Sequence, residues 1–233
     1  MVDIPVTAKI SDSDKAPPSA MSRIYRILND DIELVYPHTP LHDGRAQYSN
    51  PVTLPQSERR VLVRAIFAFV EGLSYSLRVS LLEQHSKTLK ASEIMALNEE
   101  QLDITNSGDV RVKSIKASLM SLVCLTVKQY SKCYAEKLKL ECAGSGFEGL
   151  VSSVRVRDRL MHPRSDIDLI ITDEEITRAV LGFLWFHGAF VSMMIAELGF
   201  LRELVESKAR QVDMVMEETQ VLFARLEAEK KES

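Results

Sequence analysis

Apolar residues recur every three or four positions along most of the chain, which is the spacing of one face of a helix. The clearest run follows the turn-like stretch from Pro37 to Pro55 and predicts a long helix starting at Ser57. Ser57 is a favourable N-cap residue, and Glu58 adds a negative charge to the first turn. The apolar face of this helix is formed by Leu62, Ile66, Phe69, Leu73, Leu77 and Leu81.

The sequence before this helix is less regular. Residues 1 to about 22 are rich in Ser, Asp, Lys and Pro, a composition that predicts a mobile tail. Residues 23–36 predict a short helix followed by a short strand. Residues 1–55 are therefore expected to form an N-terminal extension that is partly flexible.

The segment after the first long helix contains polar clusters. Residues 88–110, with Asn106-Ser107-Gly108 among them, indicate a short helix and a loop. Apolar residues then return at helical spacing and predict a second long helix from about Val112 to about Leu140. A third helix is expected to open with Ser145 and Glu148, which stand at the spacing of a capping box.

The third helix ends in a basic segment. Pro163 disfavours helical geometry in the residue before it, so the helix should stop at His162. Arg157 lies seven residues after the apolar Leu150 and points within about 20° of the same side of the helix. An arginine on that side needs an anionic partner, because an unpaired buried charge is costly. Asp158 is adjacent but shares that face only in part.

A fourth helix is predicted to begin at Thr172, where Glu175 completes another capping box. Its apolar positions continue to Leu201, and the charged tail that follows carries a looser apolar stripe. A helix over residues 173–231 would span roughly 90 Å, at about 1.5 Å per residue. Because one bundle is far shorter, we expect a break near Gly199 or Ser207, or else a projecting arm.

Four long helices with short connections predict an all-α fold, with an up-down four-helix bundle as the simplest architecture. The bundle is assigned to residues 56–205, after the extended N-terminal segment of residues 1–55. Residues 206–233 are assigned to a charged C-terminal helical tail, the end of a long C-terminal helix.

Composition narrows the class of protein. The chain has 233 residues, 45% of them hydrophobic and 27% charged, as in an ordinary soluble domain. A net charge of −4 excludes a polycation that coats nucleic acid, so any RNA contact must come from a local basic patch. The N-terminus lacks the features of a signal peptide, and the most apolar run is too short to span a membrane. A cytoplasmic protein without membrane contact is expected.

Metal and cofactor chemistry has little support in the sequence. Cys124, Cys133 and Cys142 are widely spaced and form no CxxC pair, so neither a zinc site nor a disulfide framework is predicted. His38 and His42 are four residues apart but lie among prolines rather than on a helix. No metal and no cofactor are expected.

The basic end of the third helix is the strongest candidate for chemistry. Four arginines, Arg155, Arg157, Arg159 and Arg164, stand against Asp158 and give residues 155–164 a net charge of +3. A histidine titrates near neutrality and can take the proton from a ribose 2′-hydroxyl. An arginine is always charged and forks onto phosphate oxygens. This pair of side chains suits metal-free cleavage of RNA.

The segment Arg157-Asp158-Arg159-Leu160-Met161-His162-Pro163 resembles the signature of HEPN domains. In both, an arginine and a polar residue are followed by three residues, a histidine and then a proline, near the end of a helix in an all-α bundle. The sequence DLIITDEEI of residues 168–176, which leads into a long helix, is also similar to many members. The resemblance covers roughly residues 57–200.

The resemblance implies a metal-independent endoribonuclease that leaves a 2′,3′-cyclic phosphate. It also implies a homodimer that brings two copies of the motif into one cleft, often in a toxin–antitoxin or antiphage system, with an antitoxin or regulatory protein as a candidate partner. Carried over by position, His162 is the catalytic base, Arg157 binds phosphate and Asp158 orients them. The neighbouring arginines, Arg155, Arg159 and Arg164, are expected to contact RNA. Glu71 is a candidate for the same cleft.

Three other interpretations remain open. Cations at the C-terminus of a helix stabilise the helix dipole, which alone could account for Arg157 and His162. A HEPN-like domain can also bind RNA or a protein partner without cutting. In a purely structural adaptor, the charged tail would pair with another helix. His187, on the apolar face of the fourth helix, is interpreted as a core or cleft histidine.

Overall fold

The computed structural model describes residues 19–40, 46–134 and 138–232, and this part of the chain is predominantly helical, which confirms the all-α prediction. Its helices are α1 (Ala20–Val35), α2 (Gln56–His85), α3 (Ala91–Leu97), α4 (Leu119–Cys133), α5 (Gly144–Met161) and α6 (Asp173–Glu232). Short antiparallel hairpins join β1 (His38–Pro40) to β2 (Ala46–Tyr48) and β3 (Glu100–Ile104) to β4 (Val110–Ser114), and 3-10 turns form η1 (Pro51–Thr53) and η2 (Ile167–Leu169). Most of the predicted mobile tail lies outside the described residues.

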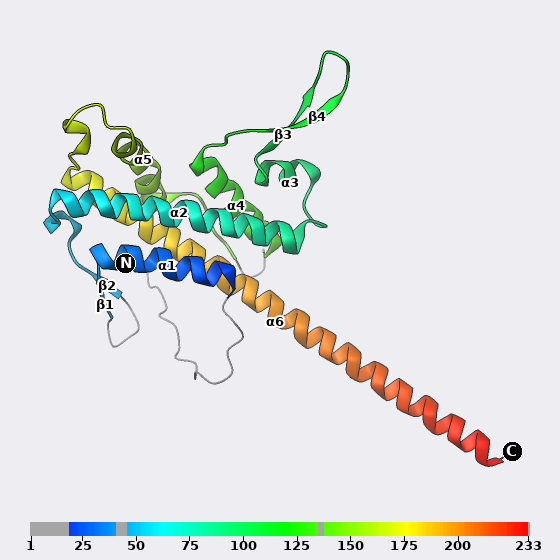
Figure 1. Cartoon of the computed structure of the whole chain (residues 1–233). Helices are drawn as coiled ribbons and strands as arrows, with labels where there is room; N and C mark the ends of the chain where they lie inside the picture. The colour runs from blue at the N-terminus through cyan, green and yellow to red at the C-terminus, as the bar shows by residue number, and fades with distance from the viewer. Residues whose placement is uncertain (1–18, 41–45, 135–137, 233) are drawn as a thin grey trace.

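Helix α2 runs through the centre of the fold and contacts α1, α4, α5 and α6 (Figure 1). All six residues of its predicted apolar face are at most 1% exposed, so the helical period located the core correctly. The start of α2 differs slightly from the prediction. The helix begins at Gln56, and its N-cap is Pro55. Proline has no side-chain acceptor, so no side-chain cap forms, but its fixed φ suits the entry to a helix.

Residues 23–36 form no strand, so the prediction of a helix followed by a strand was wrong. Residues 23–35 belong to α1, and Tyr36 is its C-cap. The N-cap of α1, Ser19, accepts a hydrogen bond from the Ser22 amide at 3.1 Å. Ile32 and Tyr36 are each 1% exposed and join the common core. Residues 20–36 of the predicted N-terminal extension therefore contribute to the packing of the domain.

The loop predicted before the second long helix is a hairpin, and that helix begins later than expected. Strands β3 and β4 pair Leu102 with Val112 and Ile104 with Val110. The turn between them contains Gly108 at φ 84°, a left-handed conformation that favours glycine. Apolar residues alternate with polar ones on each side of this turn, which is the period of a strand. Helix α4 starts only at Leu119 and ends at Cys133.

Helices α5 and α6 approach closely through glycines, and this contact holds the basic segment in place. A Cβ at Gly149 would lie 2.6 Å from the Arg178 carbonyl oxygen. A Cβ at Gly182 would lie 2.6 Å from both the amide nitrogen and the Cα of Leu150. Both clashes involve backbone atoms, so a larger residue at either position would push the helices apart.

Helix α6 begins as predicted and runs without a break to Glu232. Thr172 Oγ1 accepts from the Glu175 amide at 3.2 Å, and a Glu175 carboxylate oxygen accepts from the Thr172 amide at 2.9 Å. The expected break at Gly199 or Ser207 is absent from this described helix, and the alternative of a projecting arm is confirmed (Figure 1).

Two helices contain windows that are long and apolar enough to cross a membrane, Gln56–His85 and the first part of α6. In each window, 56% is buried inside the fold. Core helices of soluble proteins have the same property, so these windows are weak support for membrane insertion and are compatible with a soluble protein.

Candidate functional site

The C-terminal half of α5 carries the predicted motif. The helix ends at Met161, and His162 forms its C-cap with φ −134° and ψ 58°, which confirms the predicted stop before Pro163. The His162 amide still donates to the Asp158 carbonyl at 3.1 Å. The predicted capping box at the other end is not formed, because Ala143 is the N-cap and makes no side-chain cap hydrogen bond.

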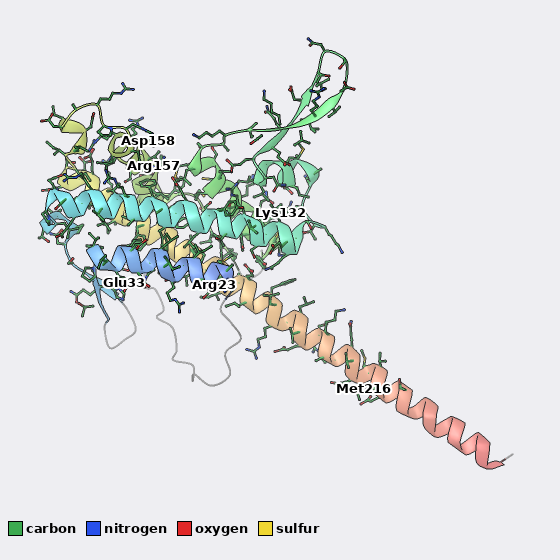
Figure 2. The ribbon with its side chains drawn as sticks, viewed as in Figure 1. Arg23, Glu33, Lys132, Arg157, Asp158 and Met216 are labelled. Atoms are coloured by element: carbon green, nitrogen blue, oxygen red, sulfur yellow. The ribbon has the colours of Figure 1, made fainter. Side chains whose placement is uncertain are left out.

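Arg157 lies between two carboxylates. One guanidinium nitrogen forms an ion pair with Glu71 of α2. Another donates to Asp158 Oδ1 at 3.0 Å, and Figure 2 labels Arg157 and Asp158 near the end of α5. The Arg157 side chain is 32% exposed, so it is held by the fold yet reachable from solvent. The anionic partner expected from the sequence is thus present, and Glu71 lines the same region.

His162 is the C-cap of α5, five positions after Arg157. Its side chain is exposed and makes no hydrogen bond or ion pair with any described residue. Both ring nitrogens are therefore left without a partner among the described residues. Packing therefore leaves the predicted base available to a ligand or to a second protein chain.

Arg159 is committed to the architecture of the following loop. Its guanidinium binds both Glu175 carboxylate oxygens, at 2.6 and 2.8 Å, and donates to the carbonyls of Asp168 at 3.0 Å and Ile170 at 2.6 Å. The hydrogen bonds from Arg159 hold the pKa of Glu175 below its usual value. A contact between Arg159 and RNA would have to compete with these bonds.

The loop after Pro163 is ordered by its own carboxylates. Asp168 accepts from the amides of Arg164 at 2.8 Å and Ser165 at 3.0 Å, and these bonds, led by that of Arg164, lower the pKa of Asp168. The side chain of Arg164 is exposed and unpaired within the described part of the chain. This predicted RNA contact therefore stands close to His162 on a fixed turn.

Two basic residues of α2 border the same region, although neither was predicted as a site residue from the sequence. Arg64 donates to the Leu160 carbonyl at 3.2 Å, and Arg60 donates to the Leu169 carbonyl at 3.2 Å. Arg60, Arg64 and Glu71 are separated by four and seven residues and so share one face of the helix. That spacing was the available signal, but only the tertiary structure shows that this face meets α5.

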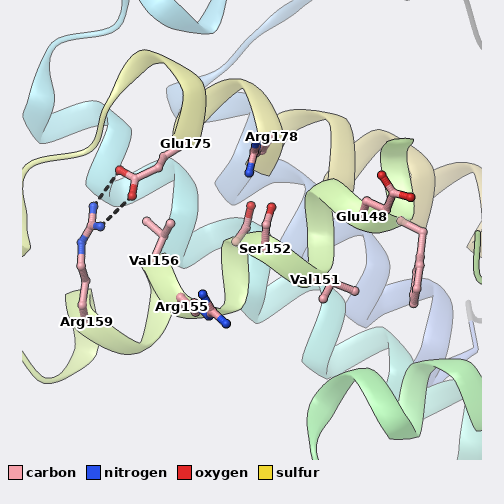
Figure 3. Close-up of a pocket in the computed structure, with 10 residues that line it drawn as sticks. Glu148, Val151, Ser152, Arg155, Val156, Arg159, Glu175 and Arg178 are labelled. Carbon is pink, nitrogen blue, oxygen red and sulfur yellow. Dashed lines mark hydrogen bonds and ion pairs between the residues drawn. The ribbon is translucent and has the colours of Figure 1, made fainter. Parts of the chain in front are cut away.

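An open groove of about 630 Å³ runs along the opposite side of α5, between α5 and α6 (Figure 3). Residues along it include Arg155, Arg159, Glu175 and Arg178. Arg155 and Arg157 are two positions apart, about 200° around the helix. The structure thus separates the predicted site residues, with Arg157 facing α2 and Arg155 exposed at the groove.

The tertiary structure also reduces the positive charge predicted for residues 155–164. Arg157 is paired with Glu71, and Arg159 is paired with Glu175. Within the described ranges, no group of three or more His, Cys, Asp or Glu side chains is arranged to hold a metal ion. The groups that this end of α5 presents to a ligand are an exposed imidazole and a partly exposed, ion-paired guanidinium.

Comparisons with protein-family models, with curated proteins and with solved structures give no significant match.

Proposed function

We propose that this chain is a metal-independent endoribonuclease of HEPN type that acts as a cytoplasmic homodimer. One observation carries the proposal. The exposed, unpaired His162 ends the same helix on which Glu71 and Asp158 hold Arg157. A free histidine and a fixed but reachable arginine near the end of one helix are the minimum set of side chains for RNA cleavage by general base and electrostatic catalysis.

In the proposed reaction, His162 removes the proton from a ribose 2′-hydroxyl. The 2′-oxygen attacks the adjacent phosphorus, and the bond from phosphorus to the 5′-oxygen breaks. A 2′,3′-cyclic phosphate and a free 5′-hydroxyl result. Arg157 stabilises the charge that develops on the phosphate oxygens, while Asp158 keeps the guanidinium oriented. The leaving 5′-oxygen takes a proton, for which His162 of a second copy is the proposed donor.

The remaining roles follow from accessibility. Arg164, on the turn next to His162, is the nearest proposed RNA contact, and Arg155 would meet RNA on the other side of α5. Helices α2, α4, α5 and α6 are proposed as the HEPN bundle. A two-fold axis near His162 would join two motifs in one cleft. A toxin–antitoxin or antiphage role, with a neutralising partner, belongs to the same proposal.

The test is cleavage of tRNA and total RNA by the purified chain in EDTA. Wild type should cut and leave 2′,3′-cyclic phosphate ends, identified by mass spectrometry. His162→Ala should lower the rate about 10²- to 10⁴-fold, the usual contribution of general acid–base catalysis. Arg202→Ala, an exposed position on the distal part of α6, is the control and should cut normally. Equal rates for wild type and His162→Ala would remove the catalytic assignment.

A second candidate function is a non-catalytic module that binds RNA or a protein partner. The ion pairs of Arg157 and Arg159 favour it, because they reduce the positive charge available for catalysis. In that case wild type would bind RNA without cutting it. His162→Ala would keep the affinity, whereas Arg157→Ala would weaken it.

A further inference from the structure

We call residues 198–232 of α6 the arm. The ring of Phe200 still contacts those of His85 and Tyr134, and beyond it the arm projects from the body as a single helix (Figures 1 and 2). Its root is firmly fixed. Glu197 is 6% exposed and accepts hydrogen bonds from Ser80 Oγ at 2.8 Å, from Tyr130 OH at 3.0 Å and from the Gln84 side-chain amide. Three neutral donors from α2 and α4 thus hold α6 in place where the arm begins.

Beyond this root, the arm exposes apolar side chains. Val205 is 67% exposed, Val212 58% and Val215 60%. Most helical stability in proteins comes from packing an apolar face against a neighbour. The exposed stripe is therefore a candidate docking face.

The spacing of the stripe specifies a helical partner. Positions alternate in steps of three and four, the a and d positions of a heptad repeat, at Leu198, Leu201, Val205, Lys208, Val212 and Val215. In the sequence, the same spacing continues at Thr219, Leu222 and Leu226. Seven of these nine positions are apolar, and a repeat sustained over four heptads is typical of a coiled coil.

We propose that the arm forms an antiparallel, two-stranded coiled coil with the arm of a second copy of this chain. The two-fold axis passes between positions 213 and 214. Val212 then faces Val215 of the second copy, and Val205 faces Leu222. Leu201 likewise falls opposite position 226, and the polar Lys208 and Thr219 share one layer. At the end of the seam, Leu198 falls opposite Glu229, the one layer in which an apolar and a charged residue meet.

Charge selects this orientation over the parallel one. A parallel pair would place Lys208 against its own copy inside the seam, and would do the same to Glu229, which occupies the next d position after Leu222 in the sequence. Like charges in a desolvated seam are strongly unfavourable. The antiparallel register places a threonine opposite Lys208, so its ammonium group meets a hydroxyl instead of another cation.

The first experiment measures the mass of the full chain by sedimentation equilibrium and its helix content by circular dichroism. Val212→Glu places a charge in the seam and should halve the mass of the assembly and lower its helicity. The matched control is Met214→Glu. Met214 is 56% exposed and lies outside the a and d positions, so this variant should keep the wild-type mass. A monomeric wild type, or equal masses for Val212→Glu and wild type, would overturn the proposal.

The second experiment fixes the orientation. A photo-crosslinking amino acid replaces Leu201 in the full chain, and the crosslinked peptides are identified by mass spectrometry. Antiparallel pairing predicts crosslinks to residues 222–230 of the second copy. Crosslinks confined to the peptide around position 201 would contradict it. Neither experiment depends on RNA cleavage, so a failure of the proposed nuclease would leave both outcomes interpretable.

Discussion

Arg157 and Arg159 lie two residues apart on one helix, yet the fold uses them differently. Arg157 contacts Glu71 and Asp158 at a reachable surface, whereas Arg159 binds Glu175 and two carbonyls of the next loop. The sequence indicated that Arg157 needs an anion, because its place on the helix follows from the helical period. It gave no such signal for Arg159, since Glu175 reaches it only after the chain has turned back.

Glu71 offers a direct test of how Arg157 is positioned. Glu71→Gln keeps the shape of the side chain but removes the charge that orients the guanidinium. We expect kcat for RNA cleavage to fall roughly tenfold, about 1.4 kcal/mol of transition-state stabilisation, while KM changes little. Steady-state kinetics on a defined RNA would measure both. A lower KM with unchanged kcat would instead mean that Glu71 only competes with phosphate for Arg157.

His187 predicts a pH dependence of stability. It is 8% exposed, its Nε2 is 2.7 Å from Tyr25 OH, and burial lowers its pKa from 6.5 to about 4. Above pH 6.5 both folded and unfolded states hold a neutral ring. As the pH falls from 6.5 towards 4, the unfolded chain takes up the proton first, so stability falls by up to roughly 3 kcal/mol.

Urea unfolding at pH 7 and pH 5 would measure this loss. His187→Gln removes the titrating group and should show a smaller drop between the two pH values than wild type. The difference between the two proteins isolates His187 from the carboxylates that titrate in the same range. Parallel curves for wild type and variant would rule out His187 as the source.

Among the helices and strands, the sequence predicted the features that follow from the spacing of residues along one helix. It missed the features that require two segments to pair. The apolar face of α2 and the end of α5 at His162 follow from spacing and from Pro163. The hairpin of β3 and β4 was missed because its strands are five residues each, and the apolar Val112 was assigned to the next helix. The opposing faces of Arg155 and Arg157 could be derived from the helix, but which neighbour each face meets could not.

The glycine contact between α5 and α6 supports a prediction about the site. In Gly182→Ala, the new Cβ would meet the backbone of Leu150 at 2.6 Å, which cannot move without shifting α5. We expect a loss of about 1–3 kcal/mol, as for other overpacked cores, together with reduced RNA cleavage because the motif moves. Gly72→Ala is the control, since its Cβ would meet the end of the Leu28 side chain at 2.8 Å.

Thermal unfolding and cleavage assays on the two variants would compare these effects. The Leu28 side chain can rotate away, so Gly72→Ala should change stability by no more than about 1 kcal/mol and leave cleavage unaffected. Similar losses in both variants would show that the backbone contact at Gly182 does not position the motif.

The whole molecule has its two proposed interfaces at opposite ends. The motif lies beside the start of α6, where Arg159 contacts Glu175, and the proposed axis of the arm passes near position 213. Along a helix of about 1.5 Å per residue, these points are roughly 57 Å apart. Pairing of the arms therefore cannot bring two copies of His162 together, and each interface has its own two-fold axis.

Because the two proposed interfaces are far apart, cleavage activity should respond differently to dilution of the chain and to mutation of the arm. If the catalytic site needs two motifs, specific cleavage activity should fall when the chain is diluted below the dissociation constant of the motif interface. Val212→Glu should lose the arm contact but keep its cleavage rate per chain at high concentration within about twofold, because the arm lies far from the phosphate site. Activity titrations of wild type, Val212→Glu and Met214→Glu over the same concentration range would compare these effects. A large loss of cleavage in Val212→Glu alone would contradict the assignment of the arm contact and the catalytic site to separate interfaces.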